Sequence, residues 1–571
     1  MIPQAVLQLA HFCKEVGLFN FVVSPGSRSA PLVLALSRIG GINLHIVADE
    51  RSAGFIALGM AMGKESPVGL LCTSGTAVLN YAPAIAEAFY QQVPLFVITA
   101  DRPPEWIDQN EGQAIRQNYV FQQHTKFSSV LPSLDESQAA AIHTRRLLNQ
   151  AWYEATQFPK GPVHLNVPLR EPLYPTEAIN FQSVEQKGLY INLIQSKPEP
   201  DRFALSALIE KFNSYSKRLV VVGQSGPNRE LRNSLTALAD YGSVPILGDC
   251  IHNLNQLKGQ VSRSEWFTDR FWSRDEIQPE LLITLGNGLI SKPLKQFLAK
   301  VKPKEHWHLC LAGFPADPFG THSQIIHSDP SFVLSKLAEG AYFQGETTSK
   351  GAKDYANAWF KESEGVGSKI RDAVSKSEWS DFSATELVLS QLPKESLIFL
   401  GNSMAIRYAN WLSSHFRDSH LIYSNRGTSG IDGCVSTAVG LAKSQPDKPV
   451  IALVGDISFF YDRNGLWSQP IPPNLKIAVL NNGGGNIFRI IPGSGKVAEL
   501  EDLFELNQTL HAKRTAEDAE MGYYQINGYQ PDTNSSQVLA WINSPKAALL
   551  EYITNKYVNA EVVANLRKEL L

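Results

Sequence analysis

The sequence predicts an α/β protein built from three doubly wound domains, each around a parallel sheet. The chain has 571 residues, whereas a single hydrophobic core stops growing at roughly 250 to 300 residues. Short β-rich runs alternate with helical patterns, which is the rhythm of βαβ units. The runs are almost continuously apolar, as expected for strands whose sheet is covered by helices on both faces.

The first region is predicted at residues 1–185. Its clearest strand candidates, between residues 19 and 103, are FNFVVSPG, HIVADE, VGLLCTSG and PLFVITADRPP. Helical patterns separate these runs, and one of them, SAGFIALGMAMG, consists largely of small and apolar residues. A proline-rich exit, GPVHLNVPLREPLYP at 161–175, marks the end of the rhythm.

The second region is predicted at 190–345 and the third at 355–571. RLVVVGQSGP and ELLITLGNGLISK are the clearest strand-to-loop units of the second region. The stretch from 340 to about 376 is rich in Gly, Ser, Lys and Glu, so we expect a linker with an exposed helix there. The third region repeats the rhythm of the first in SLIFLGNS, HLIYSNRG, KPVIALVGD and LKIAVLNNGGG.

Composition and charge exclude several classes of function. The net charge of −3 offers no global basic field to attract a nucleic acid or an anionic membrane. The five cysteines form no C-x-x-C pair, which favours a reducing cytoplasm. Lys14 and Glu15 interrupt the apolar run that a signal peptide needs, and no window reaches the roughly 18 apolar residues of a membrane span. We expect an untargeted cytoplasmic protein that binds neither nucleic acid nor membrane.

Two further sequence patterns do not indicate a ligand-binding site. The glycine turns at 223–226 and 286–288 lack the full G-x-G-x-x-G pattern with a later acidic residue, so we interpret them as scaffold rather than as a nucleotide site. The 13 histidines form no H-x-x-x-H pair that would indicate a metal site, and they stay unassigned.

Oxygen-bearing side chains end two neighbouring strands of the third region. Asp456 ends one apolar strand and Asn482 ends the next, with a glycine run after it that lets carbonyl groups approach closely. Ligands of parallel sheets bind beyond the carboxyl ends of the strands, and Mg²⁺ prefers oxygen ligands. Two ordinary capped turns would explain either residue alone. The paired spacing favours a site for Mg²⁺, or Mn²⁺, made by Asp456, Asn482 and the carbonyl of Gly484.

The stretch from Gly455-Asp456 to Asn481-Asn482 resembles the thiamine-diphosphate motif, with Ile457 where the general motif has a third glycine. The first region also contains SPGSRSAPL, TSGTAV, ADRPPE and QAIRQ, and the third contains GNSMAIR, SNRGTSGIDG and GDISFFYDRNGL. This set closely resembles the 2-succinyl-5-enolpyruvyl-6-hydroxy-3-cyclohexene-1-carboxylate synthase family of menaquinone biosynthesis. The resemblance covers both outer regions almost fully and the middle region weakly. It implies an N-terminal pyrimidine-binding domain, a central domain and a C-terminal diphosphate-binding domain.

The resemblance assigns cofactor roles to residues of both outer regions. Glu50 is the catalytic carboxylate that bonds the aminopyrimidine ring of thiamine diphosphate and promotes loss of its C2 proton. The other cofactor-binding residues are Ile431, which props the cofactor into its bent shape, Gly455, Asp456, Ser458 and Asn482. From the residues alone, Glu50 precedes a helix of small residues, where poor solvation would raise the pKa of its carboxyl group. A helix N-terminal acid and a core isoleucine are the ordinary alternatives.

The family is a group of transferases (carboligases) that decarboxylate 2-oxoglutarate and join the resulting unit to isochorismate by 1,4-addition. Both substrates carry two carboxylates, and the guanidinium of Arg matches a carboxylate with two parallel hydrogen bonds. For any single arginine a surface salt bridge is an equally ordinary explanation. The resemblance implies substrate contacts from ten residues: Ser27, Arg28, Arg102, Gln113, Lys292, Ser403, Arg407, Arg426, Ile487 and Phe488.

Two positions depart from the family pattern. Ser291-Lys292-Pro293 stands where a Lys-Arg pair is expected, and Gly112 stands where relatives can have Asn. These departures leave the reaction intact and put individual substrate contacts in question.

Because Glu50 and the metal motif lie in different regions, and the superfamily joins them across two chains, the resemblance implies a homodimer or a dimer of dimers. The active site would then lie between chains. One alternative is another thiamine-diphosphate enzyme, such as an acetolactate synthase or a 2-oxoacid decarboxylase, which would have less need of the arginines. A second is an inactive relative with a binding or regulatory role, which would have lost Glu50 or Asp456.

Overall fold

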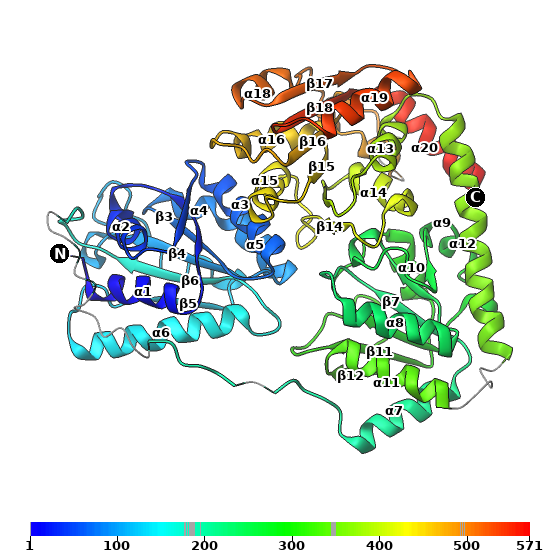
Figure 1. Ribbon diagram of the computed structural model, residues 1–571, viewed down its shortest axis with the longest axis horizontal. Helices are drawn as coiled ribbons and strands as arrows, with labels where there is room; N and C mark the ends of the chain where they lie inside the picture. Colours follow the sequence, from blue (N-terminus) through cyan, green and yellow to red (C-terminus); the bar gives the residue numbers. More distant parts are fainter. Residues whose placement is uncertain are drawn as a thin grey trace.

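In the computed structural model, the described residues form three six-stranded sheets in which every strand pair is parallel (Figure 1). The structure describes residues 2–175, 179, 181, 189–194, 196–343, 350–491, 493, 495 and 497–570. The predicted fold class, three doubly wound α/β domains, is confirmed. The predicted ranges 1–185, 190–345 and 355–571 each enclose one sheet, and the ends at 185 and 345 lie outside the described residues.

The first sheet belongs to the N-terminal domain and has the strand order β2-β1-β3-β4-β6-β5. Its strands are β1 (Asn20–Ser24), β2 (Asn43–Ile46), β3 (Val68–Cys72), β4 (Leu95–Asp101), β5 (Phe127–Val130) and β6 (Val163–Pro168). Its helices are α1 (Gln4–Glu15), α2 (Ala30–Arg38), α3 (Glu50–Lys64), α4 (Thr76–Asn80), α5 (Ala82–Gln91) and α6 (Gln138–Thr156). Because the strands are parallel, the loops after β1, β2 and β4 emerge at one edge of the sheet.

The second sheet belongs to the central domain and has the order β12-β11-β10-β7-β8-β9. Its strands are β7 (Arg218–Val222), β8 (Ile246–Gly248), β9 (Gln260–Val261), β10 (Leu281–Leu285), β11 (Glu305–Cys310) and β12 (Gln324–His327). Its helices are α7 (Arg202–Ser214), α8 (Arg229–Gly242), α9 (Glu265–Phe271), α10 (Lys292–Lys300) and α11 (Pro330–Phe343). A loop over residues 311–323, all of them described and none helical, connects β11 to β12.

The third sheet repeats the strand order of the first, as β14-β13-β15-β16-β18-β17. Its strands are β13 (Leu397–Leu400), β14 (Leu421–Tyr423), β15 (Val450–Gly455), β16 (Leu475–Asn481), β17 (Gly522–Ile526) and β18 (Ala548–Ile553). The helices of this part are α12 (Lys350–Lys376), α13 (Asp381–Ser390), α14 (Met404–Trp411), α15 (Cys434–Ser444), α16 (Asp456–Tyr461), α17 (Ile487–Ile490), α18 (Lys513–Asp518), α19 (Pro531–Ile542) and α20 (Lys556–Leu570).

Helix α12 is more buried than the sequence analysis expected. Its Tyr355, Trp359, Val366 and Ile370 are buried, and their spacing of four or seven residues, one or two helical turns, makes one apolar stripe. The Trp359 ring lies 5.7 Å from that of Phe297 in the central domain. The helix runs along the side of the molecule from the central to the C-terminal domain (Figure 1). The prediction of an exposed helix was therefore wrong for its inner face.

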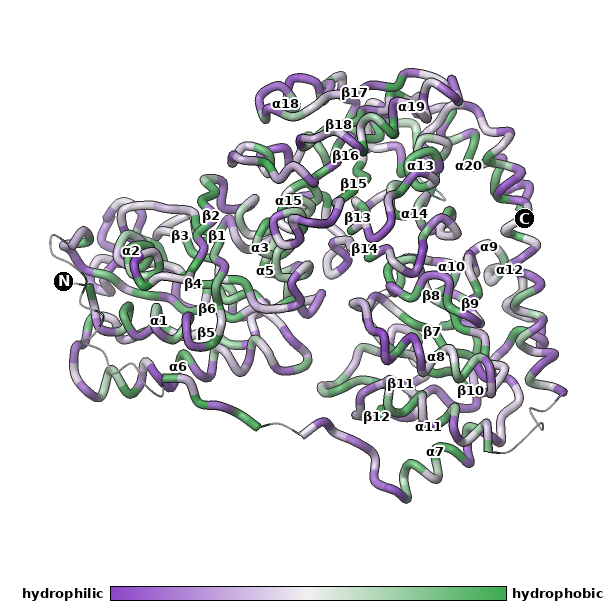
Figure 2. The backbone as a smooth tube through the Cα atoms, viewed as in Figure 1, coloured by the Kyte–Doolittle hydropathy of each residue, from purple (hydrophilic) through white to green (hydrophobic). Residues whose placement is uncertain are grey.

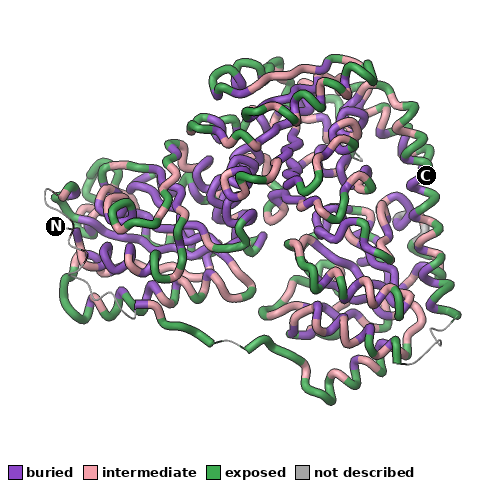
Figure 3. The backbone as a smooth tube through the Cα atoms, in the orientation of Figure 1, coloured by how far each residue is buried: buried purple, intermediate pink, exposed green. Residues whose placement is uncertain are grey.

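The N-terminal domain packs on the C-terminal domain. Buried apolar residues of α3 and α5 share one cluster with residues of α15, β15 and β16, while a second cluster joins the central and C-terminal domains. Figure 2 shows hydrophobic residues along the central strands of the sheets. The chain reaches the central domain through a segment whose described residues from 191 to 201 are mostly exposed (Figure 3). No helix of the described chain combines the length and the apolar character that crossing a bilayer requires.

Candidate functional site

Helices α3 and α15 cross at glycines. A Cβ atom on Gly59 would lie 2.1 Å from the backbone oxygen of Thr437, and one on Gly440 would lie 2.1 Å from the backbone oxygen of Ile56. Side chains larger than hydrogen cannot fit at either position without moving a backbone. The two helices therefore touch along their backbones, and the contact joins the N-terminal to the C-terminal domain.

The crossing brings the beginnings of the two helices to the same end. Phe55, near the start of α3, lies against Gly433, just before α15, whereas Gly63 lies against Ser444 at the other end. Glu50 begins α3, and the loop that carries Ile431 leads into α15. The contact thus brings Glu50 and Ile431 to the same end of the interface between the N-terminal and C-terminal domains.

The residues on either side of Glu50 form hydrogen bonds to the C-terminal domain. The side chain of Asp49 caps α3 at the backbone N–H of Ser52 and also accepts a hydrogen bond of 2.8 Å from the side chain of Asn464. Arg51 donates to the backbone oxygen of Tyr461 at 3.0 Å. Burial raises the pKa of the Glu50 carboxyl group above its ordinary value, and the charge of Asp49 acts in the same direction. A carboxyl group with a raised pKa holds a proton more readily than an ordinary one, which suits a general acid or base.

Asp456 lies at the junction of β15 and α16 and is surrounded by donors. Its Oδ2 accepts hydrogen bonds of 2.9 Å from the backbone of Gly483, the backbone of Gly484 and the side chain of Gln508. Burial raises the pKa of the Asp456 carboxyl group to about 7, against the lowering effect of these bonds, and the charge of Asp381 adds to the increase. A nearby cation would reverse this effect and stabilise the carboxylate.

Asn482 presents an oxygen to the same place. Its Nδ2 donates to Oδ2 of Asp381 at 2.8 Å, and its buried Oδ1 has no hydrogen-bond partner among the described residues. The carbonyl of Gly484 accepts one bond, of 3.1 Å, from the backbone of Asn486, which leaves it a second lone pair. A carboxylate, an unpartnered amide oxygen and a carbonyl form a donor set that fits a hard divalent cation.

The remaining cofactor candidates are Gly455, Ser458 and Ile431. Gly455 precedes α16 with an extended backbone, and Ser458, within α16, is buried. Ile431 is half-buried in the loop before α15. We call residues 424–433, which join β14 to α15, the arginine loop.

The arginine loop is braced by Asn402, which follows β13. Arg426 donates to the side-chain oxygen of Asn402 at 2.9 Å. The amide of Asn402 donates in turn to the backbone oxygens of Asn425 and Gly430, both at 2.7 Å. Ser403, the next residue, has a φ of +72°, a region that residues with side chains rarely adopt. Such backbone strain is typical of functional sites, and it places the Ser403 carbonyl against Nη1 of Arg407.

A group of cations lies where the central and C-terminal domains meet. Burial lowers the pKa of Arg407, and the charge of Arg426 lowers it further. Burial, followed by the same charge of Arg426, also lowers the pKa of Lys295 on α10. Lys292, exposed at the start of α10, adds another positive charge near Lys295. Glu265 and Asp249 offset part of this positive charge at Arg407 and Arg426. The arginines and lysines together can attract a substrate with several carboxylates.

Lys295 was missed by the sequence analysis. It lies three residues after Lys292, on the same face of α10. The three-residue spacing on one face of a helix is the sequence signal that could have identified Lys295. The family pattern of an adjacent Lys-Arg pair does not point to a lysine three residues further on.

A second cationic group lies at the edge of the N-terminal sheet. The guanidinium carbons of Arg28 and Arg102 lie 5.3 and 5.7 Å from the centre of the Trp106 ring. Arg28 is 2% exposed and donates to the backbone oxygen of Leu169 at 2.8 Å. Arg102 donates to the backbone oxygen of Gly112 at 3.0 Å. Both arginines bond to residues of the N-terminal domain. Their position relative to the C-terminal domain therefore depends on the α3–α15 contact.

The other predicted substrate residues lie on loops and a short helix. Ser27 is exposed after β1, and Gln113, with a φ of +59°, packs against Gly75. Ile487 and Phe488 begin α17, directly after the glycine run, and the ring of Phe488 lies 6.0 Å from that of Phe504. The backbone of Phe488 donates to the carbonyl of Gly485 at 3.2 Å, so this helix begins against the glycine run.

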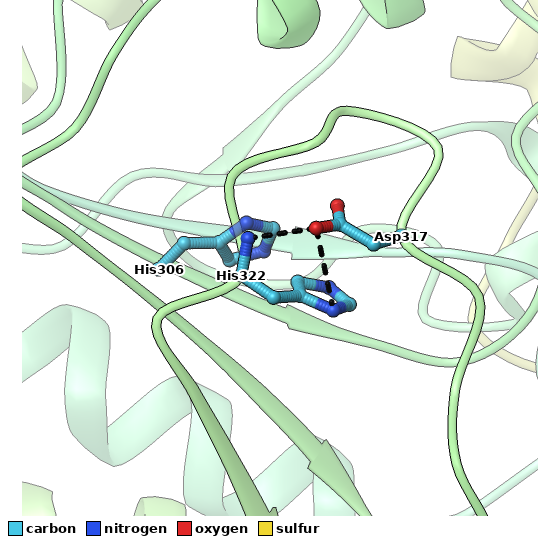
Figure 4. Close-up of side chains that lie close together, drawn as sticks. All are labelled: His306, Asp317 and His322. Atoms are coloured by element: carbon cyan, nitrogen blue, oxygen red, sulfur yellow. Dashed lines mark hydrogen bonds and ion pairs between the residues drawn. The ribbon is translucent and has the colours of Figure 1, made fainter.

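One further group in the described chain has the chemistry of metal ligands: His306, Asp317 and His322 (Figure 4). One ligand atom from each lies within 4.8 Å of the others. Both ring nitrogens of His306 are already bonded, at 2.8 Å, to the hydroxyls of Thr284 and Thr321. Asp317 accepts from the backbone of His322 at 2.9 Å. The group is therefore explained as a polar network that fixes loop 311–323 on the sheet.

Residues 4–126 match the protein family described as thiamine pyrophosphate enzyme, N-terminal TPP binding domain. Thiamine pyrophosphate is another name for thiamine diphosphate. The match covers the part of the N-terminal domain that contains Glu50, Arg28 and Arg102 and ends before β5.

Over nearly its whole length, the chain is similar to bacterial proteins that share the name 2-succinyl-5-enolpyruvyl-6-hydroxy-3-cyclohexene-1-carboxylate synthase. It is 36% identical over 578 residues to the protein of Cytophaga hutchinsonii, which covers 99% of each chain. It is 36% identical over 580 residues to that of Flavobacterium psychrophilum, covering 100% of this chain and 98% of the relative. It is 34% identical over 552 residues to that of Desulfotalea psychrophila, covering 95% of this chain and 97% of the relative.

Proposed function

Because this chain belongs to the 2-succinyl-5-enolpyruvyl-6-hydroxy-3-cyclohexene-1-carboxylate synthase family of thiamine-diphosphate enzymes, we propose that it decarboxylates 2-oxoglutarate and adds the four-carbon remainder to isochorismate. The products are 2-succinyl-5-enolpyruvyl-6-hydroxy-3-cyclohexene-1-carboxylate and CO₂, in menaquinone biosynthesis. The observation that carries this function is the gathering of Arg407, Arg426 and Lys295 beside the strand ends of the C-terminal sheet. Substrates with two carboxylates each need such a concentration of cations.

The cofactor is held by the C-terminal domain, with Mg²⁺ or Mn²⁺ bound by Asp456, Asn482 and the carbonyl of Gly484. Support comes from the amide oxygen of Asn482, which is buried and has no partner in the described part of the chain. Gly455 and Ser458 lie next to Asp456 and would face the diphosphate. When bound, thiamine diphosphate supplies the nucleophilic carbon and the electron sink for decarboxylation.

Glu50 moves the proton that activates the cofactor. Its carboxyl group would hold a proton for the aminopyrimidine ring of bound thiamine diphosphate, and burial favours this role by raising the pKa of Glu50. Ile431 supports the cofactor from the arginine loop, which the α3–α15 contact holds at the same end as Glu50.

The polar side chains bind and orient the two substrates. Arg28 and Arg102 from the N-terminal domain, and Arg407, Arg426 and Lys292 from the other two, bond the substrate carboxylates. Ser27, Gln113 and Ser403 give neutral hydrogen bonds, and Ile487 with Phe488 forms an apolar wall that excludes water. Because both substrates are bound in one geometry, the entropy loss of bringing them together occurs on binding and not in the reaction step.

The protein assembles as a homodimer or a dimer of dimers. In the structure α3 meets α15 of its own chain. The described residues from 191 to 201, which follow the N-terminal domain, are mostly exposed, with Ile194 92% exposed, so an exchange of these domains between two chains would break few contacts of this segment. The site would then lie between chains with the same contacts. A cytoplasmic location is supported by the five cysteines, all in the described part of the chain and all free.

The test is an assay of the purified protein with Mg²⁺ and thiamine diphosphate. It is given 2-oxoglutarate with and without isochorismate, and separately pyruvate, while CO₂ and the adduct are followed. We expect an adduct that depends on isochorismate. Turnover of pyruvate alone would favour an acetolactate synthase or a 2-oxoacid decarboxylase, and cofactor binding without turnover would favour an inactive relative.

A further inference from the structure

One buried carboxylate on helix α5 of the N-terminal domain holds the arginine loop of the C-terminal domain. Glu87 is 1% exposed. Its Oε1 accepts from the backbone of Gly427 at 2.6 Å, and its Oε2 accepts from the backbone and the hydroxyl of Thr428 at 2.7 and 2.6 Å. Three short bonds to one carboxylate fix the backbone of the loop at this point.

Gln91, one helical turn further along α5, extends the contact. Its Oε1 accepts from the backbone of Arg426 at 3.2 Å. Its Nε2 donates to the sulfur of Met62 at 3.7 Å, which orients the amide. Three consecutive backbone N–H groups of the loop, at Arg426, Gly427 and Thr428, are therefore bonded by two side chains of α5.

Gly427 permits this close approach. A Cβ atom at this position would lie 2.6 Å from the backbone oxygen of Glu87 and 3.0 Å from the backbone nitrogen of Gln91. The loop backbone therefore lies directly on the helix. A loop in such contact has little freedom to adopt a second position.

The bonds on the other side of the loop carry this constraint into the site. The guanidinium of Arg426 donates to Asn402, whose amide bonds the backbone oxygen of Gly430, the residue before Ile431. The position of the loop backbone thus decides where the Arg426 side chain lies and where Ile431 begins. Glu87 bonds backbone N–H groups of the loop and Asn402 bonds its carbonyl groups, so the two side chains hold it together.

From these contacts we infer that Glu87 is a positioning residue for substrate recognition: it fixes the arginine loop so that Arg426 meets a substrate carboxylate. This inference rests on the proposed function of Arg426. Both carboxylate oxygens of Glu87 are taken up by the loop, so it acts through Arg426 and not on the substrate. An amide could not replace it, because its NH₂ group would face backbone N–H groups.

The test compares Glu87→Gln with wild type and with Glu210→Gln, an exposed change on α7. We expect the Gln variant at 87 to raise the KM for at least one substrate about tenfold or more, with a smaller change in kcat, because a charged hydrogen-bond acceptor is lost. Glu210→Gln should have the same KM values as wild type. A normal KM for both substrates in folded Glu87→Gln would overturn the inference.

A double-variant cycle separates positioning from general destabilisation. In an Arg426→Lys background, Glu87→Gln should cost less than about twofold in kcat/KM, because the residue it positions is already changed. An equal loss of kcat/KM on Glu87→Gln in the wild-type and Arg426→Lys backgrounds would overturn the inference. Should Glu87→Gln fail to fold, Thr428→Val, which removes a single hydroxyl bond on an exposed residue, takes its place in both comparisons with the same criteria.

Hydrogen exchange keeps this inference distinct from the proposed function. In Glu87→Gln, or in the replacement variant, the amides of residues 426–428 should exchange faster than in wild type, whatever the substrate is. Unchanged exchange would refute the positioning contact. Absence of an isochorismate-dependent adduct in wild type, with faster exchange in the variant, would refute the proposed function and leave the loop contact standing.

Discussion

Asn482 donates its side-chain amide to the buried carboxylate of Asp381 across 2.8 Å, and its own Oδ1 is left without a partner among the described residues. Asp381 is held in turn by the hydroxyl of Thr554 at 2.6 Å. An amide whose NH₂ group is bonded can offer its oxygen in one direction only. Asp381 therefore orients Asn482 toward the place where a cation would complete the site.

Replacing Asp381 by Asn should weaken Mg²⁺ binding roughly 10- to 100-fold, the usual effect of losing a partner that orients a metal ligand. The amide of Asn482 would be free to turn its NH₂ group toward the cation. Titration of the metal-free protein with Mg²⁺, in the presence of thiamine diphosphate and followed by calorimetry, measures the change. Asp532→Asn, an exposed change on α19, is the control. Equal Mg²⁺ affinities in all three proteins would contradict the role of Asp381.

Glu50→Gln should slow exchange of the cofactor's C2 proton by about 10² to 10⁴-fold, the usual contribution of a positioned acid or base. The fold should remain, because the side chains are nearly the same size. Exchange of the C2 proton with deuterium, followed by NMR on the bound cofactor, measures the rate. Glu65→Gln, at the exposed far end of α3, is the matched control. An unchanged rate would remove Glu50 from its proposed role.

Arg407→Lys should lower kcat/KM roughly 10- to 100-fold, because lysine cannot form two parallel bonds with a carboxylate and a charged hydrogen bond contributes about 1.5 to 3 kcal/mol. Steady-state kinetics with each substrate varied in turn show which substrate Arg407 binds. Arg417→Lys, an exposed change outside the site, should leave both KM values unchanged. Equal kinetics in the two variants would exclude Arg407 from substrate binding.

The stability of the protein should depend on pH through Glu265. Burial raises the pKa of Glu265 to about 7, and the charge of Asp249 adds to this, against hydrogen bonds from Trp411 and Asn410. An acid with a raised pKa keeps its proton longer in the folded state, so its effect on stability becomes less favourable as pH rises from about 4.5 to about 7. Calorimetry should show a smaller fall of Tm over this range in Glu265→Gln than in wild type. A slope equal to that of wild type would contradict the effect.

Gly59→Ala should separate the two crossing helices. The added carbon would lie 2.1 Å from the backbone oxygen of Thr437, and overpacking of this kind costs about 1 to 3 kcal/mol or more. We expect a lower Tm and weaker binding of thiamine diphosphate. The control is Gly365→Ala in α12, where the new carbon meets no described atom within 4 Å and a better helix former should be neutral or stabilising. Similar Tm values for both variants would contradict the close crossing.

Several elements could be predicted from the sequence because their signal is local. The apolar runs predicted for β1, β3, β4, β7, β10, β13, β15 and β16 all form strands, since a strand buried between two layers of helices needs an unbroken apolar run. Strand β5, with sequence FSSV, and β9, of two residues, carry no such run. Strand β11, EHWHLC, was missed because its histidines bond polar side chains inside the domain. The buried face of α12 was missed because its apolar stripe lies among many Lys, Glu and Gly residues.

By itself, the sequence determined the fold class, the family and the residues that stand at the strand ends, among them Glu50, Asp456 and Asn482. The fold class follows from the periodicity of apolar residues, and the family and these residues follow from the resemblance of local motifs. Only the tertiary structure decided that Asp381 orients Asn482, that Lys295 joins the cations and that Glu87 holds the arginine loop. Glu87 and Gly427 are 340 residues apart, and no local pattern predicts a contact that depends on how two domains pack.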